Sequence, residues 1–347
     1  QNRLRVWPAP LILGLEARAN RSRLMSPQRS LASSPAQGQI VFLFMLEDSL
    51  PHWRVWQEFF AGAPKGSYRA LVHCSNYTSC RSYAPLRSLG IELLRTVPSK
   101  WCTDLVSPAQ HLALHALVSA DPAAGMEKFV LMSGSALPLR PFTAVQAVLL
   151  EGDASDICPS DAIHWANGKV GGIDYSIVKH SQWAVLSRRD AEAFVRGWAE
   201  VSRFGSDTQT GAPVFLGWSV PRMGRDGRAN MSDRVNRSSL LPYTWRCPDE
   251  EVLTSLIFGL YEPDRRSLWQ DTLSGRGCRT FLEWSGGKPV EYSSLTATLR
   301  NLSTTEGHGW LFARKFAAGA TLQELLPLLA RRQLAPRGAN ALVDMDK

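Results

Sequence analysis

Three consecutive carboxylates, Asp249, Glu250 and Glu251, follow Pro248 and precede an apolar repeat. A carboxylate held in a fixed position can act as a general base that takes a proton from an attacking hydroxyl group. The proline suits the first position of a helix, and the negative charges suit the positive end of the helix dipole. The same residues would therefore also stabilise a helix start without any catalytic role, and their spacing does not rank one above another.

The elements that must position these carboxylates begin with their own helix. Apolar residues recur at the spacing of one helix face, which predicts a helix over residues 247–260. The apolar positions are Val252, Leu253, Leu256, Ile257 and Leu260. The carboxylates are therefore expected at the start of a helix that is anchored in a core.

Apolar runs in the first half of the chain predict a sheet. Residues 40–46 form an unbroken apolar run, which is typical of a strand buried on both faces of a parallel sheet. Further strands are predicted at residues 68–74, 91–97, 128–132, 156–158 and 279–284, and another within residues 179–190. Helices are predicted at residues 51–60, 107–120, 143–150, 190–201 and 321–332. Strands alternating with helices predict an α/β fold with a mostly parallel, Rossmann-like central sheet flanked by helices.

A loop of small residues, Ser133, Gly134 and Ser135, directly follows the predicted strand at 128–132. In open α/β sheets, ligands bind outside the carboxyl ends of the strands. The loop is therefore a candidate ligand site, and a plain turn is the alternative, since small residues also form turns without a ligand.

Composition divides the chain into three parts. Residues 1–38 are rich in Arg, Ser, Pro and Ala without periodicity, which predicts a loosely ordered stem or linker. Residues 39–333 are predicted to form a single domain, and residues 334–347 a flexible tail. Within the domain, polar loops are expected at residues 75–87 and 204–241.

The overall composition is that of a globular protein, with 347 residues of which 44% are hydrophobic and 20% charged. A net charge of +8 suits an anionic partner. The basic residues are scattered and no RRM, zinc-finger or helix-turn-helix pattern occurs, so no nucleic-acid partner is expected. The apolar run at residues 11–15 is far too short to cross a bilayer, so membrane attachment is expected only through an anchor upstream of this sequence.

Six cysteines and five Asn-x-Ser/Thr tripeptides point to an oxidising compartment. No CxxC spacing occurs, which argues against a zinc ribbon, and the even number allows three disulfides. Cys74 and Cys80 are close enough in sequence to close a small loop. The tripeptides, which are acceptor motifs for N-glycosylation, begin at Asn20, Asn76, Asn230, Asn236 and Asn301. Together these features predict the lumen of the secretory pathway.

Metal ligation is not expected. His111 and His115 lie four residues apart on one face of a predicted helix. No third ligand accompanies them in the sequence, so we expect a structural role for this histidine pair.

Several local patterns occur in an order that resembles the core-2/I-branching β-1,6-N-acetylglucosaminyltransferase family, and most closely its plant-like and protist-like branch. The resemblance covers residues 39–332. The patterns are residues 129–139 (FVLMSGSALPL), 181–183 (SQW), 247–250 (CPDE), 280–284 (TFLEW) and 311–316 (LFARKF).

The resemblance implies a GT-A-type glycosyltransferase fold and a Golgi enzyme anchored as a type II membrane protein. Such an enzyme transfers a sugar from a UDP-sugar to a glycan acceptor and inverts the anomeric configuration. The sugar expected from the resemblance is N-acetylglucosamine. The best-known members need no metal, so no cofactor is expected. The one Asp-x-Asp triplet, a metal-holding motif in other GT-A enzymes, is residues 344–346 and follows no predicted strand.

The family motifs assign roles to individual positions. The carboxylate of the CPDE pattern, Glu250, would be the catalytic base, and Lys315, Lys288 and Arg314 would bind the donor diphosphate. A metal-free enzyme needs such cations because negative charge gathers on the leaving UDP. The residues expected at the donor loop are His73, Ser133 and Ser135. Those expected at the acceptor are Trp284, Gln182 and Trp183, and a tryptophan face can stack on a sugar ring.

Four positions depart from the family patterns and leave the donor sugar open. Cys247 replaces a serine before the proline, and Lys288 stands where the family often has histidine. The early strand ends in residues 73–75 (HCS) instead of His-x-Asp, and Gly134 replaces a glutamate. Transfer of xylose or glucuronic acid, or a non-catalytic glycan-binding or scaffold protein of the same fold, are the alternatives.

Overall fold

The computed structural model describes two long stretches of the chain and several short ones. The described residues are 38–97, 99, 101, 105–120, 125–160, 166–170, 173–201, 222–223, 229–230, 248–250, 253–254, 257, 278–286, 288–304 and 309–330. The predicted stem at 1–38 is outside this set except for residue 38, and the predicted tail at 334–347 is outside it entirely. Most of the predicted loop at 204–241 is outside it as well.

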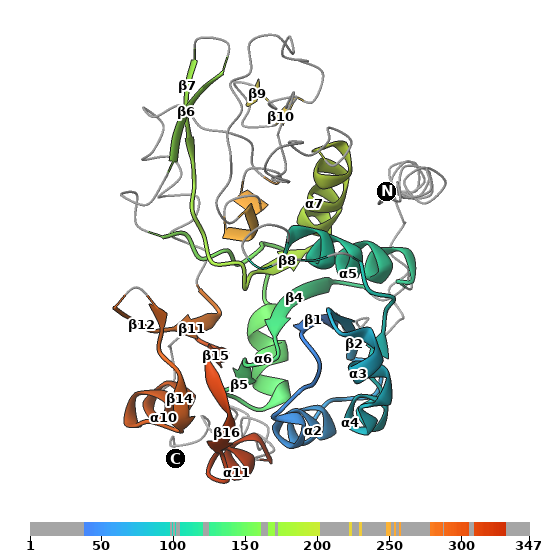
Figure 1. Ribbon diagram of the computed structural model, residues 1–347, viewed down its shortest axis with the longest axis vertical. Helices are drawn as coiled ribbons and strands as arrows, with labels where there is room; N and C mark the ends of the chain where they lie inside the picture. Colours follow the sequence, from blue (N-terminus) through green and yellow to red (C-terminus); the bar gives the residue numbers. More distant parts are fainter. Residues whose placement is uncertain are drawn as a thin grey trace, which may run out of the picture.

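A five-stranded central sheet forms the middle of the molecule, with the strand order β3-β2-β1-β4-β8 (Figure 1). The strands are β1 (Gln39–Leu46), β2 (Tyr68–Cys74), β3 (Glu92–Leu93), β4 (Glu127–Ser133) and β8 (Val185–Ser187). The first four run parallel, and β8 pairs antiparallel with β4. The prediction of an α/β fold with a mostly parallel central sheet is therefore confirmed.

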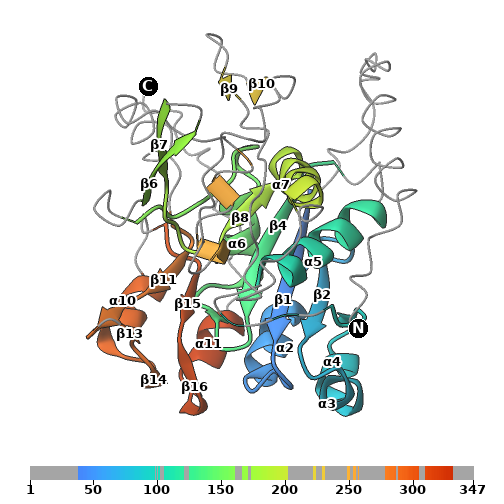
Figure 2. The same ribbon diagram turned by 45° about the horizontal axis from the view of Figure 1, so that its top comes forward.

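Helices cover both faces of this sheet (Figures 1 and 2). Helices α5 (Val106–Val118) and α7 (Arg188–Val201) pack on one face, and α2 (Trp53–Ala61) and α6 (Phe142–Leu149) pack on the other. Strand β1 has buried side chains on both faces, which explains its unbroken apolar sequence.

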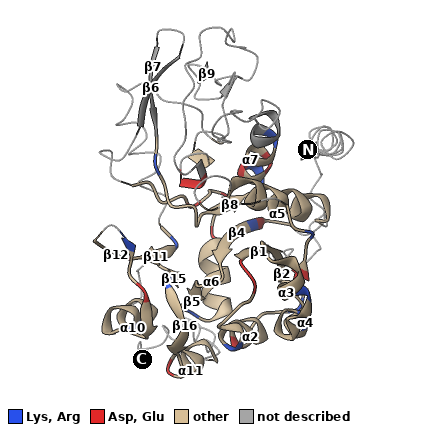
Figure 3. Ribbon diagram, viewed as in Figure 1, with Lys and Arg blue, Asp and Glu red and all other residues tan. Residues whose placement is uncertain are grey.

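The two faces have separate hydrophobic cores. Phe42 and Phe44 of β1 pack with Trp56, Phe59 and other aromatic rings on the α2 side. The alternate residues Val41 and Leu43 face α5 and α7, as the period of two in a strand requires. Figure 3 shows the contrast between helices α5 and α6, which carry no Lys, Arg, Asp or Glu, and α7, where both charge signs occur.

The C-terminal part of the chain adds small sheets beside the α2 face. Strand β15 (Phe312–Arg314) lies between β11 (Thr280–Leu282), to which it is parallel, and β5 (Leu137–Pro138), to which it is antiparallel. Phe312 is fully buried in the core that β1 and α2 share. This packing holds the C-terminal segment against the central sheet.

Further two-stranded pairs and short helices complete the described fold. The pairs are β12 (Trp284–Ser285) with β13 (Lys288–Pro289), β14 (Tyr292–Ser294) with β16 (Phe316–Thr321), β6 (Ala166–Val170) with β7 (Ile173–Ile177), and β9 (Arg222–Met223) with β10 (Ala229–Asn230). The C-terminal helices are α10 (Ala297–Thr304) and α11 (Leu325–Ala330). Among the described residues, no helix has the length and apolar character needed to cross a bilayer.

Two predictions on the N-terminal half were wrong. The expected polar loop at 75–87 contains helices α3 (Tyr77–Ser82) and α4 (Ala84–Ser88). Helix α3 begins there because the Asn76 side chain accepts a hydrogen bond from the Ser79 N–H (3.3 Å). The helix predicted at 107–120 also starts earlier than expected, since α5 begins at Val106, and Leu105 precedes it without a side-chain cap.

Two predictions further along the chain also differ from the structure. The expected strand at 156–158 is reduced to an isolated bridge between Asp156 and Val185. Residues Pro248–Glu250 form a short 3₁₀ helix, and Leu253, Thr254 and Ile257 are helical. The other residues of the predicted helix at 247–260 are outside the described set.

Candidate active site

The order of the central strands identifies the edge at which a ligand would bind. The chain moves from β1 outward to β2 and β3, and then returns to the other side of β1 as β4. A crevice outside the carboxyl ends of the strands, at such a reversal, is the usual ligand position in α/β sheets. In this chain, that position is flanked by the loops that follow β1 and β4.

The loop after β4 is tightly built. The hydroxyl oxygens of Ser133 and Ser135 are 3.2 Å apart. Between them, a Cβ atom on Gly134 would come within 2.9 Å of a Leu46 methyl group at the end of β1. A larger residue at this position would require Leu46 to move. The two loops therefore approach one another at the carboxyl edge, where the predicted donor residues Ser133 and Ser135 lie.

Glu250 is held by contacts between two distant segments of the chain. The His180 N–H donates to the carbonyl oxygen of Glu250 (2.6 Å), and the Leu253 N–H donates to Nε2 of His180 (3.1 Å). The Thr254 hydroxyl donates to the carbonyl oxygen of Val178 (3.0 Å). These three bonds join the segment before β8 to Glu250, Leu253 and Thr254.

The ring of His180 is neutral in this arrangement. Its Nε2 accepts a hydrogen bond, so the proton is on Nδ1, which donates to the Ser181 carbonyl oxygen (3.0 Å). Burial lowers the pKa of His180 to about 4, although the bond to Ser181 opposes this shift. The joint between the two segments therefore depends on an uncharged imidazole.

The joint lies beside the central sheet. Two residues beyond Gln182, the carbonyl oxygen of Ala184 accepts a hydrogen bond from the Leu131 N–H in the carboxyl-terminal half of β4 (3.0 Å). The Ser133 loop begins two residues after Leu131. The segment that supports Glu250 therefore reaches the same edge of the sheet as the serine loop.

The carboxylate of Glu250 is paired with Lys179. The distance from Lys179 Nζ to Glu250 Oε2 is 3.0 Å, and the two side chains are 40% and 27% exposed. The pair fixes the orientation of one carboxylate oxygen and remains within reach of solvent. A substrate hydroxyl group could therefore approach this carboxylate.

Arg314 brings a second positive charge close to Glu250. Its guanidinium group lies over the ring of Trp183, 4.5 Å from the ring centre, which is a cation–π geometry. Burial lowers the pKa of Arg314 to about 10, and the negative charge of Glu250 opposes this shift. The structure thus brings Glu250, Arg314 and Trp183 together, although they are far apart in the sequence.

Lys315 is connected to the serine loop through the backbone. The N–H of Phe316, the next residue, donates to the carbonyl oxygen of Ser135 (3.0 Å). The side chain of Lys315 is 42% exposed, and its Nζ is 3.5 Å from Glu291 Oε2. Lys315 is therefore next to the predicted donor loop and carries a weak, solvent-screened ion pair.

The remaining predicted site residues lie in three other environments. Trp284, which is 55% exposed, and the exposed Lys288 are on the β12–β13 hairpin, whose turn contains Gly286 with φ of 58°. Gln182 is half-buried next to Trp183. His73 is buried at the end of β2, and its Nε2 is 3.1 Å from the backbone nitrogen of Val97. Their substrate contacts stay predictions.

A covalent and ionic brace ties the C-terminal sheet to the edge of the central sheet. Cys158 and Cys278 form a disulfide, and Arg279 pairs with Asp156 at 3.0 Å. The carbonyl oxygen of Arg279 also accepts from the Leu311 N–H (2.9 Å), just before β15. This brace fixes the strand that carries Arg314 relative to the segment that precedes Lys179.

Two residues of this site, Lys179 and His180, were not assigned a role from the sequence. Neither residue belongs to a recognisable sequence motif. The only sequence signal that pointed to them was their position directly before the SQW pattern at 181–183. Within the described residues, no group of three or more His, Cys, Asp or Glu side chains could hold a metal ion. Metal independence stays a prediction.

Comparison with known proteins finds a similar glycosyltransferase. No protein-family model matches the chain. Over 174 residues, the chain is 29% identical to a rice protein named Glycosyltransferase BC10 (Oryza sativa subsp. japonica), which corresponds to 46% of this chain and 41% of that protein. The chain is similar to a glycosyltransferase. It spans about two fifths of that relative, so the sugar, acceptor and mechanism are not carried over by this match.

Proposed function

We propose that the chain is an inverting glycosyltransferase with a GT-A-type fold that moves a sugar from a UDP-sugar to a hydroxyl group of a glycan. The observation that carries this proposal is a solvent-accessible carboxylate, Glu250, fixed by Lys179 and close to Arg314. Similarity to a glycosyltransferase supports the reaction class. N-acetylglucosamine is the sugar that the motif resemblance favours.

In this mechanism Glu250 is the general base. Its carboxylate takes the proton of the acceptor hydroxyl while that oxygen attacks the anomeric carbon, and the bond between that carbon and the UDP oxygen breaks. Attack from the face opposite the leaving group inverts the anomeric configuration. The fixed position of the Glu250 backbone, set by its bond from the His180 N–H, keeps the base in place as charge moves.

The leaving diphosphate needs positive charge. Lys315 is one residue from the backbone contact with Ser135, so its ammonium group can turn from Glu291 toward a diphosphate at the serine loop. Arg314 supplies a second cation from the buried side, and Lys288 a third from the β12–β13 hairpin. Cations placed where charge develops can replace a metal ion in this role.

The acceptor would lie beside Glu250, on the face of the donor sugar opposite the diphosphate. Trp284 offers an exposed ring for stacking on a sugar face, and Gln182 adds a polar group. Trp183 has its ring under the guanidinium of Arg314, so its contribution is to orient that cation. The Golgi lumen is the location that the motif resemblance favours for this activity.

Incubation of the purified protein with UDP-sugars in the presence of EDTA tests the proposal. The donors are UDP-N-acetylglucosamine, UDP-xylose, UDP-glucuronic acid and UDP-galactose. The readouts are donor binding by calorimetry, UDP release, and the anomeric configuration of the product by NMR. We expect one donor to be selected and the product to be inverted. A folded protein that binds none of the donors would refute the proposal and favour the non-catalytic alternative.

A further inference from the structure

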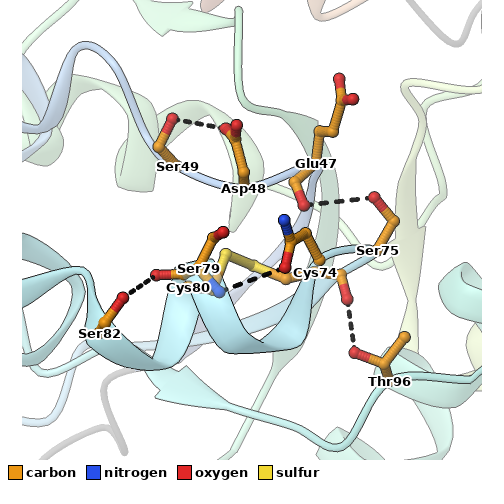
Figure 4. The surroundings of a disulfide bond; sticks show 10 residues. Glu47, Asp48, Ser49, Cys74, Ser75, Ser79, Cys80, Ser82 and Thr96 are labelled. Atoms are coloured by element: carbon orange, nitrogen blue, oxygen red, sulfur yellow. Dashed lines mark hydrogen bonds between the residues drawn. A yellow bond between two sulfur atoms is a disulfide. The ribbon is translucent and has the colours of Figure 1, made fainter.

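The sequence Asn76-Tyr77-Thr78 places an N-glycosylation acceptor motif at the start of α3. The side chains of Asn76 and Thr78 are both exposed. The motif lies inside the loop that the Cys74–Cys80 disulfide closes, which is six residues in sequence separation (Figure 4). This disulfide also implies an oxidising environment, in which N-glycosylation takes place.

The contacts of Asn76 leave one atom available. Its backbone N–H donates to the carbonyl oxygen of Glu47 (2.7 Å), and its carbonyl oxygen accepts from the Cys80 N–H (3.2 Å). Its Oδ1 accepts from the Ser79 N–H and caps α3. The amide nitrogen Nδ2 makes no hydrogen bond within the part of the chain that the structure describes. A substituent on Nδ2 would therefore disturb none of these bonds.

The surroundings of Asn76 can accommodate a large polar group. Ser75 and Asn76 are exposed, and Cys74 and Cys80 are buried beneath them. The disulfide and the bond to Glu47 hold the motif against the sheet, so that the asparagine side chain remains at the surface. Figure 4 shows Ser79 with the disulfide of Cys74 and Cys80, and next to them the segment of Glu47, whose carbonyl oxygen accepts a hydrogen bond from the Ser75 hydroxyl.

We propose that Asn76 carries an N-linked glycan. In the modification, a bond forms between Nδ2 of Asn76 and the anomeric carbon of an oligosaccharide. The bond from that carbon to the diphosphate of a lipid-linked oligosaccharide breaks, and one amide proton leaves with the lipid diphosphate. The glycan would stand beside Glu47 at the rim of the carboxyl edge of the sheet.

This proposal is independent of the glycosyltransferase activity, because it needs only passage of the chain through the secretory pathway. A non-catalytic protein would carry the same glycan, and an active enzyme could lack it. The two proposals therefore fail separately.

The test is the full chain secreted from eukaryotic cells with an added signal peptide. Peptide N-glycosidase digestion in heavy-oxygen water converts a glycan-bearing asparagine to labelled aspartate, which peptide mass spectrometry detects. We expect the label at Asn76. Thr78→Val, which removes the acceptor hydroxyl and keeps the side-chain shape, should abolish the label, and the matched control Thr78→Ser should retain it.

The wild-type measurement decides the proposal even if a variant fails to fold. Unlabelled Asn76 in secreted wild-type protein whose Cys74–Cys80 disulfide is intact would overturn it. Labelling that persists in Thr78→Val would also overturn it, because the label would then come from spontaneous deamidation.

Discussion

The position of Glu250 depends on a hydrogen bond whose loss can be measured. Replacing His180 with leucine removes the acceptor of the buried Leu253 N–H. A buried donor without a partner lowers the free energy of unfolding by about 1–3 kcal/mol. Replacing His180 with glutamine supplies a side-chain oxygen that can accept the same bond. We therefore expect His180→Leu to be less stable than His180→Gln.

The same histidine makes stability depend on pH. The folded-state pKa of His180 is lowered to about 4, and its ordinary value is 6.5. At a pH between these two pKa values, the imidazole is protonated in the unfolded chain and neutral in the folded chain. The free energy of unfolding therefore falls as the pH falls through this window. Because a tenfold change in a proton-binding constant corresponds to about 1.4 kcal/mol, the full contribution is about 3 kcal/mol. Above pH 6.5 this contribution is fully present.

Urea unfolding of wild-type protein and His180→Gln from about pH 4 to about pH 7 measures this effect. His111, whose pKa is also lowered to about 4 by burial and by the charges of His73 and His115, contributes in the same window. It does so in both proteins, so the difference between their slopes isolates His180. Equal slopes would refute the neutral-imidazole explanation, and equal stability of the leucine and glutamine variants at neutral pH would refute the hydrogen-bond explanation.

Three further predictions concern the site and its brace. Glu250→Gln should lower kcat by about 10²–10⁴-fold in a UDP-release assay and change the free energy of unfolding by less than about 1 kcal/mol, because its ion pair is partly exposed. Arg314→Met keeps an apolar chain over the Trp183 ring and removes the charge, so UDP affinity measured by calorimetry should fall by about 10–100-fold. Cys158→Ser opens a connection of 120 residues and should lower the free energy of unfolding, measured in urea, by about 2–5 kcal/mol.

Each of these predictions has an outcome that contradicts it. For the base, the matched control is Glu324→Gln, which removes an exposed carboxylate paired with Arg300 (2.7 Å) and should leave kcat unchanged. Equal activity of the two glutamine variants would exclude Glu250 as the base. Unchanged UDP affinity in Arg314→Met would place the diphosphate elsewhere, and unchanged stability in Cys158→Ser would show that the Asp156–Arg279 pair suffices as a brace.

The sequence predicts the parts of the fold that burial dictates. Strands β1, β2 and β4 were found because they lie between two layers of helices, and strand β1 shows this burial in an unbroken apolar run. Helices α3 and α4 were missed because they are short and polar, and their position depends on the Asn76 cap, the disulfide and the local backbone. Elements of this kind have no periodicity long enough to detect.

The roles of the candidate site residues stay predictions. The helix start directs attention to three adjacent carboxylates, and the motif resemblance selects Glu250 among them and also Arg314. The approach of Arg314 to both Glu250 and Trp183 was not predictable, because the three residues come from separate segments. Their approach depends on β15 packing against β5 and on the Cys158–Cys278 brace. Lys179 was missed for the same reason, since its role exists only once Glu250 is folded beside it.

The order of the strands along the chain also determines when the site can form during synthesis. Strands β1 to β4 all come from Gln39 to Ser133, so the parallel part of the sheet can assemble while the rest of the chain is still being made. Glu250 and Arg314 are synthesised much later. Strand β15, which carries Arg314, then pairs with β5, which is already present, and with β11. A ribosome-bound chain stalled before residue 278 is therefore expected to have a protease-resistant sheet and an incomplete site.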